Sequence, residues 1–278
     1  MINFNGNIVA SDTDLTHNRA FLYGDGVFET LKIIDNKILF FEDHYFRLMA
    51  SMRVIRMEIP MTFTMEYLEE QILSTAKANN CGDSARVRMT VFRNDGGYYF
   101  PKDNNISYLI HCEHLEQTLY AIGKTPYEVE LYKDFYVTAQ LLSSIKSTNK
   151  LINITGSIFA SENGLDNCLL LNDTKNVIEA LNGNIFMLSA NQLITPPVSE
   201  GCVNGIIRKQ VLAIARKMPE LEVVEAPISP FDLQKADELF LTNIIKGIQP
   251  ITRYRKKEFA TTLAAALLVK LNALVRLG

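Results

Sequence analysis

Four features of this sequence could act together in a chemical reaction. They are a lysine, an arginine, a glutamate and a helix that begins directly after a glycine. Lys146 stands in LLSSIKSTNK, between an apolar run and the predicted start of a helix. Burial and a helix N-terminus both disfavour an ammonium ion, so both lower the lysine pKa from its usual value of about 10.4. The neutral amine can condense with an aldehyde to form a Schiff base. For this segment alone, a surface lysine is the plainer interpretation.

The other residues match the needs of one aldehyde cofactor, pyridoxal 5'-phosphate. Its phosphate would suit Arg47, on the polar side of an apolar helix, and the N–H groups of Ile206 and Ile207, which follow Gly205 at a helix start. Its ring nitrogen needs an acid that keeps it protonated, and Glu179 ends an apolar strand. Each feature has a plainer alternative, namely a surface arginine, an ordinary helix start or a solvated strand end.

The first part of the chain predicts an α+β domain with an antiparallel sheet. Asn5-Gly6 between short apolar runs is typical of a hairpin. Helical spacing follows over 42–57 and 64–80, and alternating residues over 85–93 and 106–113 indicate strands. We expect this domain to span residues 1–114, followed by an interdomain linker over 115–126.

The remainder, 127–278, predicts a larger, mixed α/β domain that binds the cofactor. Helices are expected over 149–162 and 204–218, and 238–251 reads as a strand running into a loop. The apolar segment 259–278 has leucines at helical spacing but is interrupted by charges, which predicts a docking helix, not a membrane span.

The composition of the chain limits the kinds of partner, metal site and location that we expect. The chain has 278 residues and a net charge of −3, which gives no reason to expect a nucleic-acid partner. The four cysteines are far apart and form no CxxC pair, so we expect neither a metal site nor a disulfide framework. No signal peptide is evident, and free thiols favour a cytoplasmic location. We also expect no membrane partner.

Five segments, taken in order, resemble the fold type IV pyridoxal-phosphate enzymes, or class IV aminotransferases. The family contains branched-chain and D-amino acid aminotransferases and 4-amino-4-deoxychorismate lyases. The similar segments are NRAFLYGDGVFETLKI (18–33), HYFRLMAS, IKSTN, EALNGNIF and GCVNGIIRK. The resemblance covers nearly the whole chain and implies a cofactor in the cleft between two domains, together with a homodimer.

The resemblance also implies roles for individual residues. Lys146 would form the Schiff base and act as the base, while Arg47 would bind the phosphate and Glu179 the ring nitrogen. Other expected cofactor contacts are Val203 on the ring, Gly205, Ile206 and Ile207 in the phosphate cup, and Asn243 and Ile244, where relatives often carry a threonine at the latter position. For the substrate we expect Phe28 and Arg93, with Arg86 and Arg88 as rivals for the carboxylate.

We expect the first of the following three functions, and the other two remain open as alternatives. The first is transamination between an amino acid and a 2-keto acid. The second is a lyase reaction that releases pyruvate and 4-aminobenzoate from an aminodeoxychorismate substrate, because the same residues serve both reactions. The third is a non-catalytic cofactor-binding or scaffold protein of the same fold.

Overall fold

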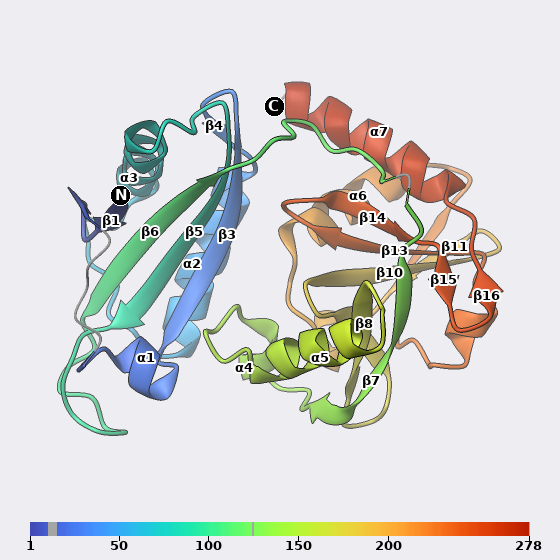
Figure 1. The fold of residues 1–278 in the computed structure, drawn as a ribbon, viewed down its shortest axis with the longest axis horizontal. Helices are drawn as coiled ribbons and strands as arrows, with labels where there is room; N and C mark the ends of the chain where they lie inside the picture. The colour runs from blue at the N-terminus through green and yellow to red at the C-terminus, as the bar shows by residue number, and fades with distance from the viewer. Residues whose placement is uncertain (11–15, 124, 278) are drawn as a thin grey trace. The chain divides into compact units, whose positions relative to one another are not determined.

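A computed structural model describes residues 1–10, 16–123 and 125–277, and the chain divides into two compact units (Figure 1). Unit 1 comprises Met1–Leu119 and Ile145–Asn149, and unit 2 comprises Tyr120–Ser144 and Lys150–Gly278. The short segment with Lys146 therefore packs with the first unit, although it lies within the stretch that sequence reasoning assigns to the second domain.

Unit 1 is built on a sheet that has six strands in the described part of the chain, all paired antiparallel, in the order β2-β1-β6-β5-β3-β4. Its strands are β1 (Ile2–Phe4), β2 (Asn7–Val9), β3 (Gly26–Ile34), β4 (Lys37–Ile38), β5 (Ser84–Arg93) and β6 (Ile106–His114), and its helices are α1 (Arg19–Tyr23), α2 (Phe41–Val54) and α3 (Met65–Ala78). The Asn5-Gly6 hairpin is confirmed, since Phe4 pairs with Asn7.

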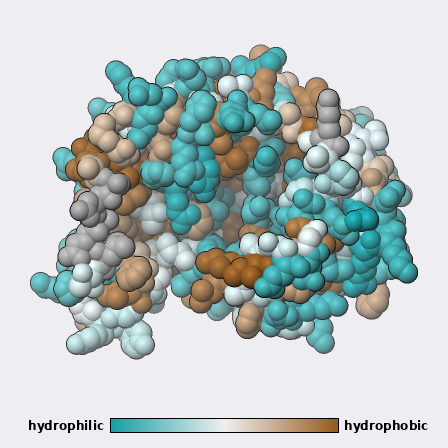
Figure 2. Space-filling view, in the orientation of Figure 1, coloured by the Kyte–Doolittle hydropathy of each residue, from teal (hydrophilic) through white to brown (hydrophobic). Residues whose placement is uncertain are grey.

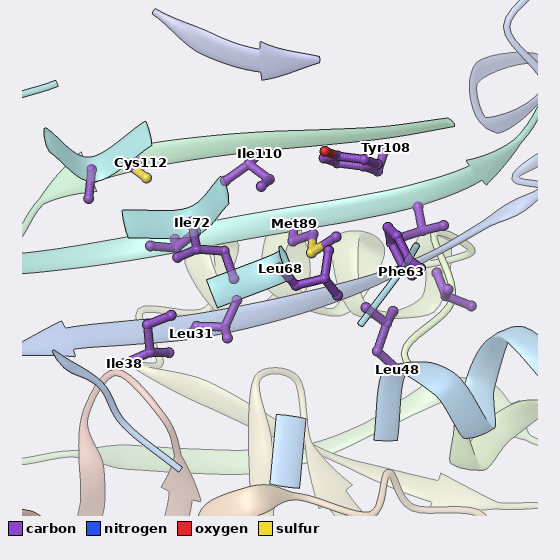
Figure 3. Close-up of a cluster of buried hydrophobic side chains, with 14 of the residues drawn as sticks. Leu31, Ile38, Leu48, Phe63, Leu68, Ile72, Met89, Tyr108, Ile110 and Cys112 are labelled. Carbon is purple, nitrogen blue, oxygen red and sulfur yellow. The ribbon is translucent and has the colours of Figure 1, made fainter. Parts of the chain in front are cut away.

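The unit 1 core forms because strands and helices each place apolar side chains on one face. Alternate residues of β3 and β5, such as Leu31 and Met89, point to the same side as Leu48 of α2 and Leu68 of α3 (Figure 3). Thr64 begins α3 by accepting a hydrogen bond from the Tyr67 N–H at 3.2 Å. The result is a two-layer unit whose helix-covered sheet face is apolar.

Unit 2 contains a mixed sheet in which β7 pairs parallel with β8 and β15, and β11 pairs parallel with β12. Its strands are β7 (Glu128–Val137), β8 (Asn167–Asn172), β9 (Val177–Ala180), β10 (Gly183–Ser189), β11 (Gln192–Thr195), β12 (Glu222–Glu225), β13 (Glu238–Asn243), β14 (Gly247–Ile251), β15 (Arg253–Tyr254) and β16 (Lys257–Glu258). Its helices are α4 (Leu141–Ser144), α5 (Leu151–Glu162), η1 (Val198–Glu200), α6 (Ile206–Ala215), η2 (Asp232–Gln234) and α7 (Thr262–Leu277).

The helices of unit 2 cover its strands. Helix α5 packs on β7 and β8, whereas α6 packs on β13 and on α7, which also contacts β14. Leu267 and Leu271 of α7 are buried, as expected for a docking helix. No helix in the described ranges is long and apolar enough to cross a membrane.

The α+β and mixed α/β architectures expected from the sequence are confirmed, but one local expectation is wrong. Helix α5 begins at Leu151 with Lys150 as its N-cap residue, two residues after the expected start at 149, and Lys146 precedes it as expected. Segment 238–251 is a hairpin of β13 and β14, because the chain reverses at 244–246 and pairs Asn243 with Gly247. Of the predicted linker, residue 124 lies outside the described residues.

Candidate active site

The segment that carries Lys146 is attached to the first residues of β3. The Phe28 N–H donates to the Lys146 carbonyl at 2.8 Å, and the Thr148 N–H donates to the Gly26 carbonyl at 2.9 Å. The Thr148 hydroxyl also donates to the Gly24 carbonyl at 2.8 Å. These bonds form a short antiparallel bridge between two stretches 120 residues apart, and they fix the backbone from which the Lys146 side chain projects.

The Lys146 side chain is half-buried and lies over an aromatic ring. Its Nζ is 4.6 Å from the centroid of the Phe28 ring, and the guanidinium carbon of Arg88 is 3.8 Å from the same centroid. Aromatic faces attract cations at such distances. Phe28 thus gathers two basic side chains, from β5 and from the 145–149 segment, at one place on the sheet.

Arg47 is held by a buried carboxylate. Its Nε donates to Glu29 Oε1 at 2.8 Å and its Nη2 donates to Oε2 at 2.5 Å. His44 lies one turn earlier on α2, and its Nδ1 is 2.7 Å from the same Oε2. Because the alternation of β3 turns Glu29 toward α2, the three side chains meet between strand and helix.

The charges of this trio follow from its surroundings. Burial alone raises the pKa of the Glu29 carboxyl, but the charge and hydrogen bonds of Arg47, together with the bond from His44, outweigh it and hold the pKa at about 2. Burial lowers the pKa of the His44 imidazole, against the opposing effect of Glu29. At neutral pH the trio is therefore a carboxylate, a guanidinium and a neutral imidazole.

In unit 2, Glu179 and Asn184 fasten the same loop. Glu179 Oε2 accepts a hydrogen bond from the Val203 N–H at 2.9 Å, and the Asn184 side-chain amide donates to the Val203 carbonyl at 2.7 Å. Glu179 lies on β9 and Asn184 directly opposite it on β10. Two cross-strand neighbours therefore set both the orientation of the carboxylate and the path of the loop before α6.

That loop leads to the N-terminus of α6, whose N-cap residue, Gly205, has no side chain with which to cap the first turn. A Cβ at Gly205 would lie 2.0 Å from Asn184 Oδ1, so this position admits glycine alone without rearrangement. Ile206 and Ile207 follow as buried residues of the first turn. An uncapped helix N-terminus offers N–H groups and a partial positive charge to an anion such as phosphate.

The turn between β13 and β14 contains Asn243 and Ile244, the remaining residues that the sequence predicts to contact the cofactor. The Asn243 side-chain oxygen accepts hydrogen bonds from the Ile245 N–H at 3.0 Å and the Lys246 N–H at 2.9 Å. The Ile244 carbonyl accepts a hydrogen bond from the Tyr120 hydroxyl at 2.8 Å. The Asn243 oxygen thus stabilises its own turn.

Comparison with known proteins identifies the family. The family described as Amino-transferase class IV matches residues 26–254, which is most of the chain. The chain belongs to the class IV aminotransferases. Enzymes of this family use pyridoxal 5'-phosphate, so this class IV aminotransferase is a pyridoxal-phosphate-dependent enzyme.

Individual relatives agree with this membership. The chain is 30% identical over 245 residues to a putative branched-chain-amino-acid aminotransferase of Methanocaldococcus jannaschii, covering 84% of this chain and 80% of that protein. Its fold matches the branched-chain aminotransferase of Thermoproteus uzoniensis with a TM-score of 0.87 at 22% identity, over 99% and 94% of the two chains. It also matches a putative 4-amino-4-deoxychorismate lyase of Legionella pneumophila with a TM-score of 0.84 at 22% identity, over 95% and 96%.

The residues of this class IV aminotransferase fit the cofactor on their own geometry. The N-cap residue of α6 is a glycine, and the Gly205 position has no room for a Cβ. In unit 1, Arg47 is already oriented and Lys146 is shielded by Phe28. A donor-rich helix end, an oriented cation and an amine on an aromatic face are the groups that a phosphorylated aldehyde requires.

Among the arginines considered for the substrate, Arg93 is deeply engaged. It is buried, and it donates to Asp25 Oδ2 at 3.0 Å, to the Ile55 carbonyl at 2.7 Å and to Asn104 Oδ1 at 2.5 Å. Arg86 pairs with Glu113 of the neighbouring strand β6, and both side chains are partly exposed. In contrast, Arg88 of this class IV aminotransferase has no hydrogen bond or ion pair to any residue that the structure describes, and burial and the Arg86 charge lower its pKa.

Sequence reasoning missed Glu29, His44 and the partnership of Arg47 with both. A signal was present, because Glu29 occupies the same side of its strand as Val27 and Leu31, where a charge needs a partner. His44 and Arg47 are three residues apart, which places them on one face of a helix.

Proposed function

We propose that this class IV aminotransferase moves an amino group between an amino acid and a 2-keto acid, and that the Lys146 amine transfers the α-proton of the amino acid. The bridge that fastens the Lys146 backbone to β3, with Nζ on the Phe28 ring, is the observation that supports this most directly. Proton abstraction requires a neutral amine held at a fixed place, and the backbone bridge and the ring together restrain the position of Nζ.

We propose these roles for the chain's own groups. When bound, pyridoxal 5'-phosphate supplies the aldehyde and the electron sink. Lys146 Nζ would hold the aldehyde and, once freed when the amino group of the substrate takes its place, would take the α-proton and deliver it to the former aldehyde carbon. Arg47 and the N–H groups of Ile206 and Ile207 hold the phosphate, and Gly205 allows the backbone to approach it. Glu179, oriented by Val203, holds the proton on the ring nitrogen. Further contacts are proposed for the Val203 side chain on the ring and for Asn243 and Ile244 near the phosphate.

We propose Arg88 as the group that binds the substrate carboxylate, in place of Arg93, with Phe28 beside it. The Arg93 donors are committed to the fold, whereas the half-buried Arg88 guanidinium has no anionic partner in the described part of the chain. A carboxylate would supply that partner through a bidentate contact. Arg88 and Lys146 also share the Phe28 ring, so the carboxylate and the amino group of one small substrate could be held together.

The test is a donor screen with the purified enzyme. L-, D- and branched-chain amino acids are supplied in turn with a 2-keto acid, and formation of the new keto acid is followed. Lys146→Ala should abolish turnover, and it should also abolish the adduct that borohydride fixes to Lys146, while thermal unfolding stays cooperative. Pyruvate release from aminodeoxychorismate without any transamination would replace this proposal with the lyase reaction.

We also propose that two copies of the chain associate as a homodimer. Apolar side chains lie exposed along one face of α5 at Leu151, Ile154 and Ile158, and the space-filling view shows brown side chains over this helix (Figure 2). Tyr98, Tyr99 and Phe100 are exposed together on a loop of unit 1. Such large apolar surfaces are typical of interfaces. Light scattering after size exclusion should give twice the chain mass of 31.4 kDa.

We propose a cytoplasmic location, which the cysteines support. Cys81, Cys112, Cys168 and Cys202 are all free and buried. Reduced thiols are typical of compartments kept reducing by glutathione. Fractionation of cells that express the tagged chain tests the location directly.

A further inference from the structure

We propose that Glu29 and His44 are positioning residues that hold the Arg47 guanidinium in the orientation in which it binds phosphate. This inference rests on the proposed role of Arg47. Arg47 is the most exposed member of the trio, with 12% of its side chain exposed against 3% for Glu29 and 1% for His44. Arg47 is thus the outermost of the three side chains and His44 the innermost, as expected if the two buried residues support the more exposed arginine.

The contact between Arg47 and Glu29 is directional. A guanidinium is planar and carries five N–H donors, and the paired bonds from Nε and Nη2 fix the plane of the group. Arginine otherwise samples many rotamers, and that freedom must be lost when it binds an anion. A guanidinium already fixed in the free enzyme loses less freedom on binding, which strengthens phosphate binding.

His44 supports Glu29 in turn. An ionised carboxylate only accepts hydrogen bonds, so the Nδ1 of His44 carries the hydrogen in the 2.7 Å contact. Its Nε2 is buried and has no hydrogen-bond partner among the described residues. The contact with Glu29 is thus the hydrogen bond that holds this imidazole, and it restrains Oε2, the oxygen that also receives Arg47 Nη2.

A purely electrostatic view predicts the opposite effect on binding. Glu29 is a negative charge close to a phosphate-binding cation, so it repels phosphate and offsets part of the Arg47 charge. If charge alone mattered, removing it would tighten phosphate binding. If orientation dominates, removing it weakens binding. The sign of the change therefore separates the two views.

The experiment compares Glu29→Gln with the unmodified cofactor-free enzyme by equilibrium dialysis. The ligands are pyridoxamine 5'-phosphate, which forms no covalent bond to lysine, and pyridoxamine, which lacks the phosphate. We expect Kd for the phosphorylated ligand to rise roughly tenfold or more, as for loss of a charged hydrogen-bond pair, and Kd for pyridoxamine to stay within about twofold. Glu113→Gln, which alters the exposed partner of Arg86, is the matched control and should change neither value.

A pair of His44 variants keeps the test decisive if Glu29→Gln folds poorly. His44→Asn retains an amide N–H close to the position of Nδ1 and should keep the phosphate-dependent affinity near that of the unmodified enzyme. His44→Leu removes the donor and should weaken binding of the phosphorylated ligand selectively. Equal losses in the two His44 variants would overturn the support role of His44.

Failure of this inference differs from failure of the proposed function. Tighter or unchanged binding of pyridoxamine 5'-phosphate by folded Glu29→Gln contradicts the positioning role while leaving the aminotransferase proposal intact. An unmodified enzyme that does not distinguish the phosphorylated ligand from pyridoxamine would overturn both, because Arg47 would then have no phosphate to bind.

Discussion

Lys146 and Phe28 are joined twice, once through their backbones and once through their side chains. The Phe28 N–H donates to the Lys146 carbonyl at 2.8 Å, and Lys146 Nζ lies 4.6 Å from the Phe28 ring centroid. The backbone bond fixes where the lysine begins, and the ring restrains where its amine ends. A flexible side chain is thereby held at both ends of its stem.

Replacing Phe28 with leucine should therefore disturb Lys146 without unfolding the protein. Loss of the ring removes a cation–π contact worth about 1 kcal/mol that restrains the amine and favours its protonated form, so we expect kcat to fall by roughly fivefold to tenfold and the pH profile of kcat to move to lower pH. Phe231→Leu, at an exposed position in unit 2, is the control. Identical pH profiles for Phe28→Leu and the unmodified enzyme would contradict a role for the ring.

Arg88→Gln should raise KM for amino acid donors. Glutamine has no positive charge and cannot form the paired N–H bonds that a guanidinium makes to a carboxylate. We therefore expect KM to rise about tenfold or more, with a smaller change for an amine donor that lacks a carboxylate. Arg86→Gln serves as the comparison, since Arg86 is paired with Glu113 on the neighbouring strand. A KM that rises for Arg86→Gln and not for Arg88→Gln would reverse the assignment.

Gly205→Ala should weaken cofactor binding. The added Cβ would lie 2.0 Å from Asn184 Oδ1, which forces the loop or Asn184 to move and disturbs the bond from Asn184 to the Val203 carbonyl. We expect Kd for pyridoxal 5'-phosphate to increase at least about tenfold, in line with loss of a charged hydrogen-bond network. Gly123→Ala, where the nearest atom is 3.9 Å away, should leave Kd unchanged.

Stability should fall in acid through Glu29. Its pKa is about 2 in the folded protein against an ordinary value of 4.5, so the unfolded chain takes up this proton first as the pH falls. The stabilisation, about 3 kcal/mol from this difference, is complete above pH 4.5 and is lost progressively as the pH falls toward 2. His44, whose pKa is lowered by burial from 6.5, adds a loss that begins below its ordinary value.

Urea unfolding of the cofactor-free enzyme between pH 7 and pH 3.5 measures this dependence. Glu29→Gln should give a flatter profile across the acidic range, because glutamine has no proton to take up. A profile for Glu29→Gln as steep as that of the unmodified protein would show that other carboxylates govern the acid response.

Much of the fold could be predicted from the sequence because its signals are local. The Asn5-Gly6 turn, the Thr64 cap and the alternation of β5 each depend on neighbours within a few residues. The order of the five motifs was also visible, and it implied the family that the comparison confirmed. Hydrophobic periodicity and helix capping depend on residues close together in the chain, so the sequence alone determines the helices, the strands and their apolar faces.

The partners of the functional side chains were decided by tertiary structure. Lys146 lies far along the chain from β3, and only strand pairing brings it to Phe28, a contact that the sequence did not predict. The same holds for Arg93, whose donors are committed to groups up to 68 residues away. Glu29 reaches Arg47 because the register of β3 turns it toward α2. The sequence determines the type of each side chain. Its protonation state and its conformational freedom depend on the groups, distant in the chain, that the fold packs against it.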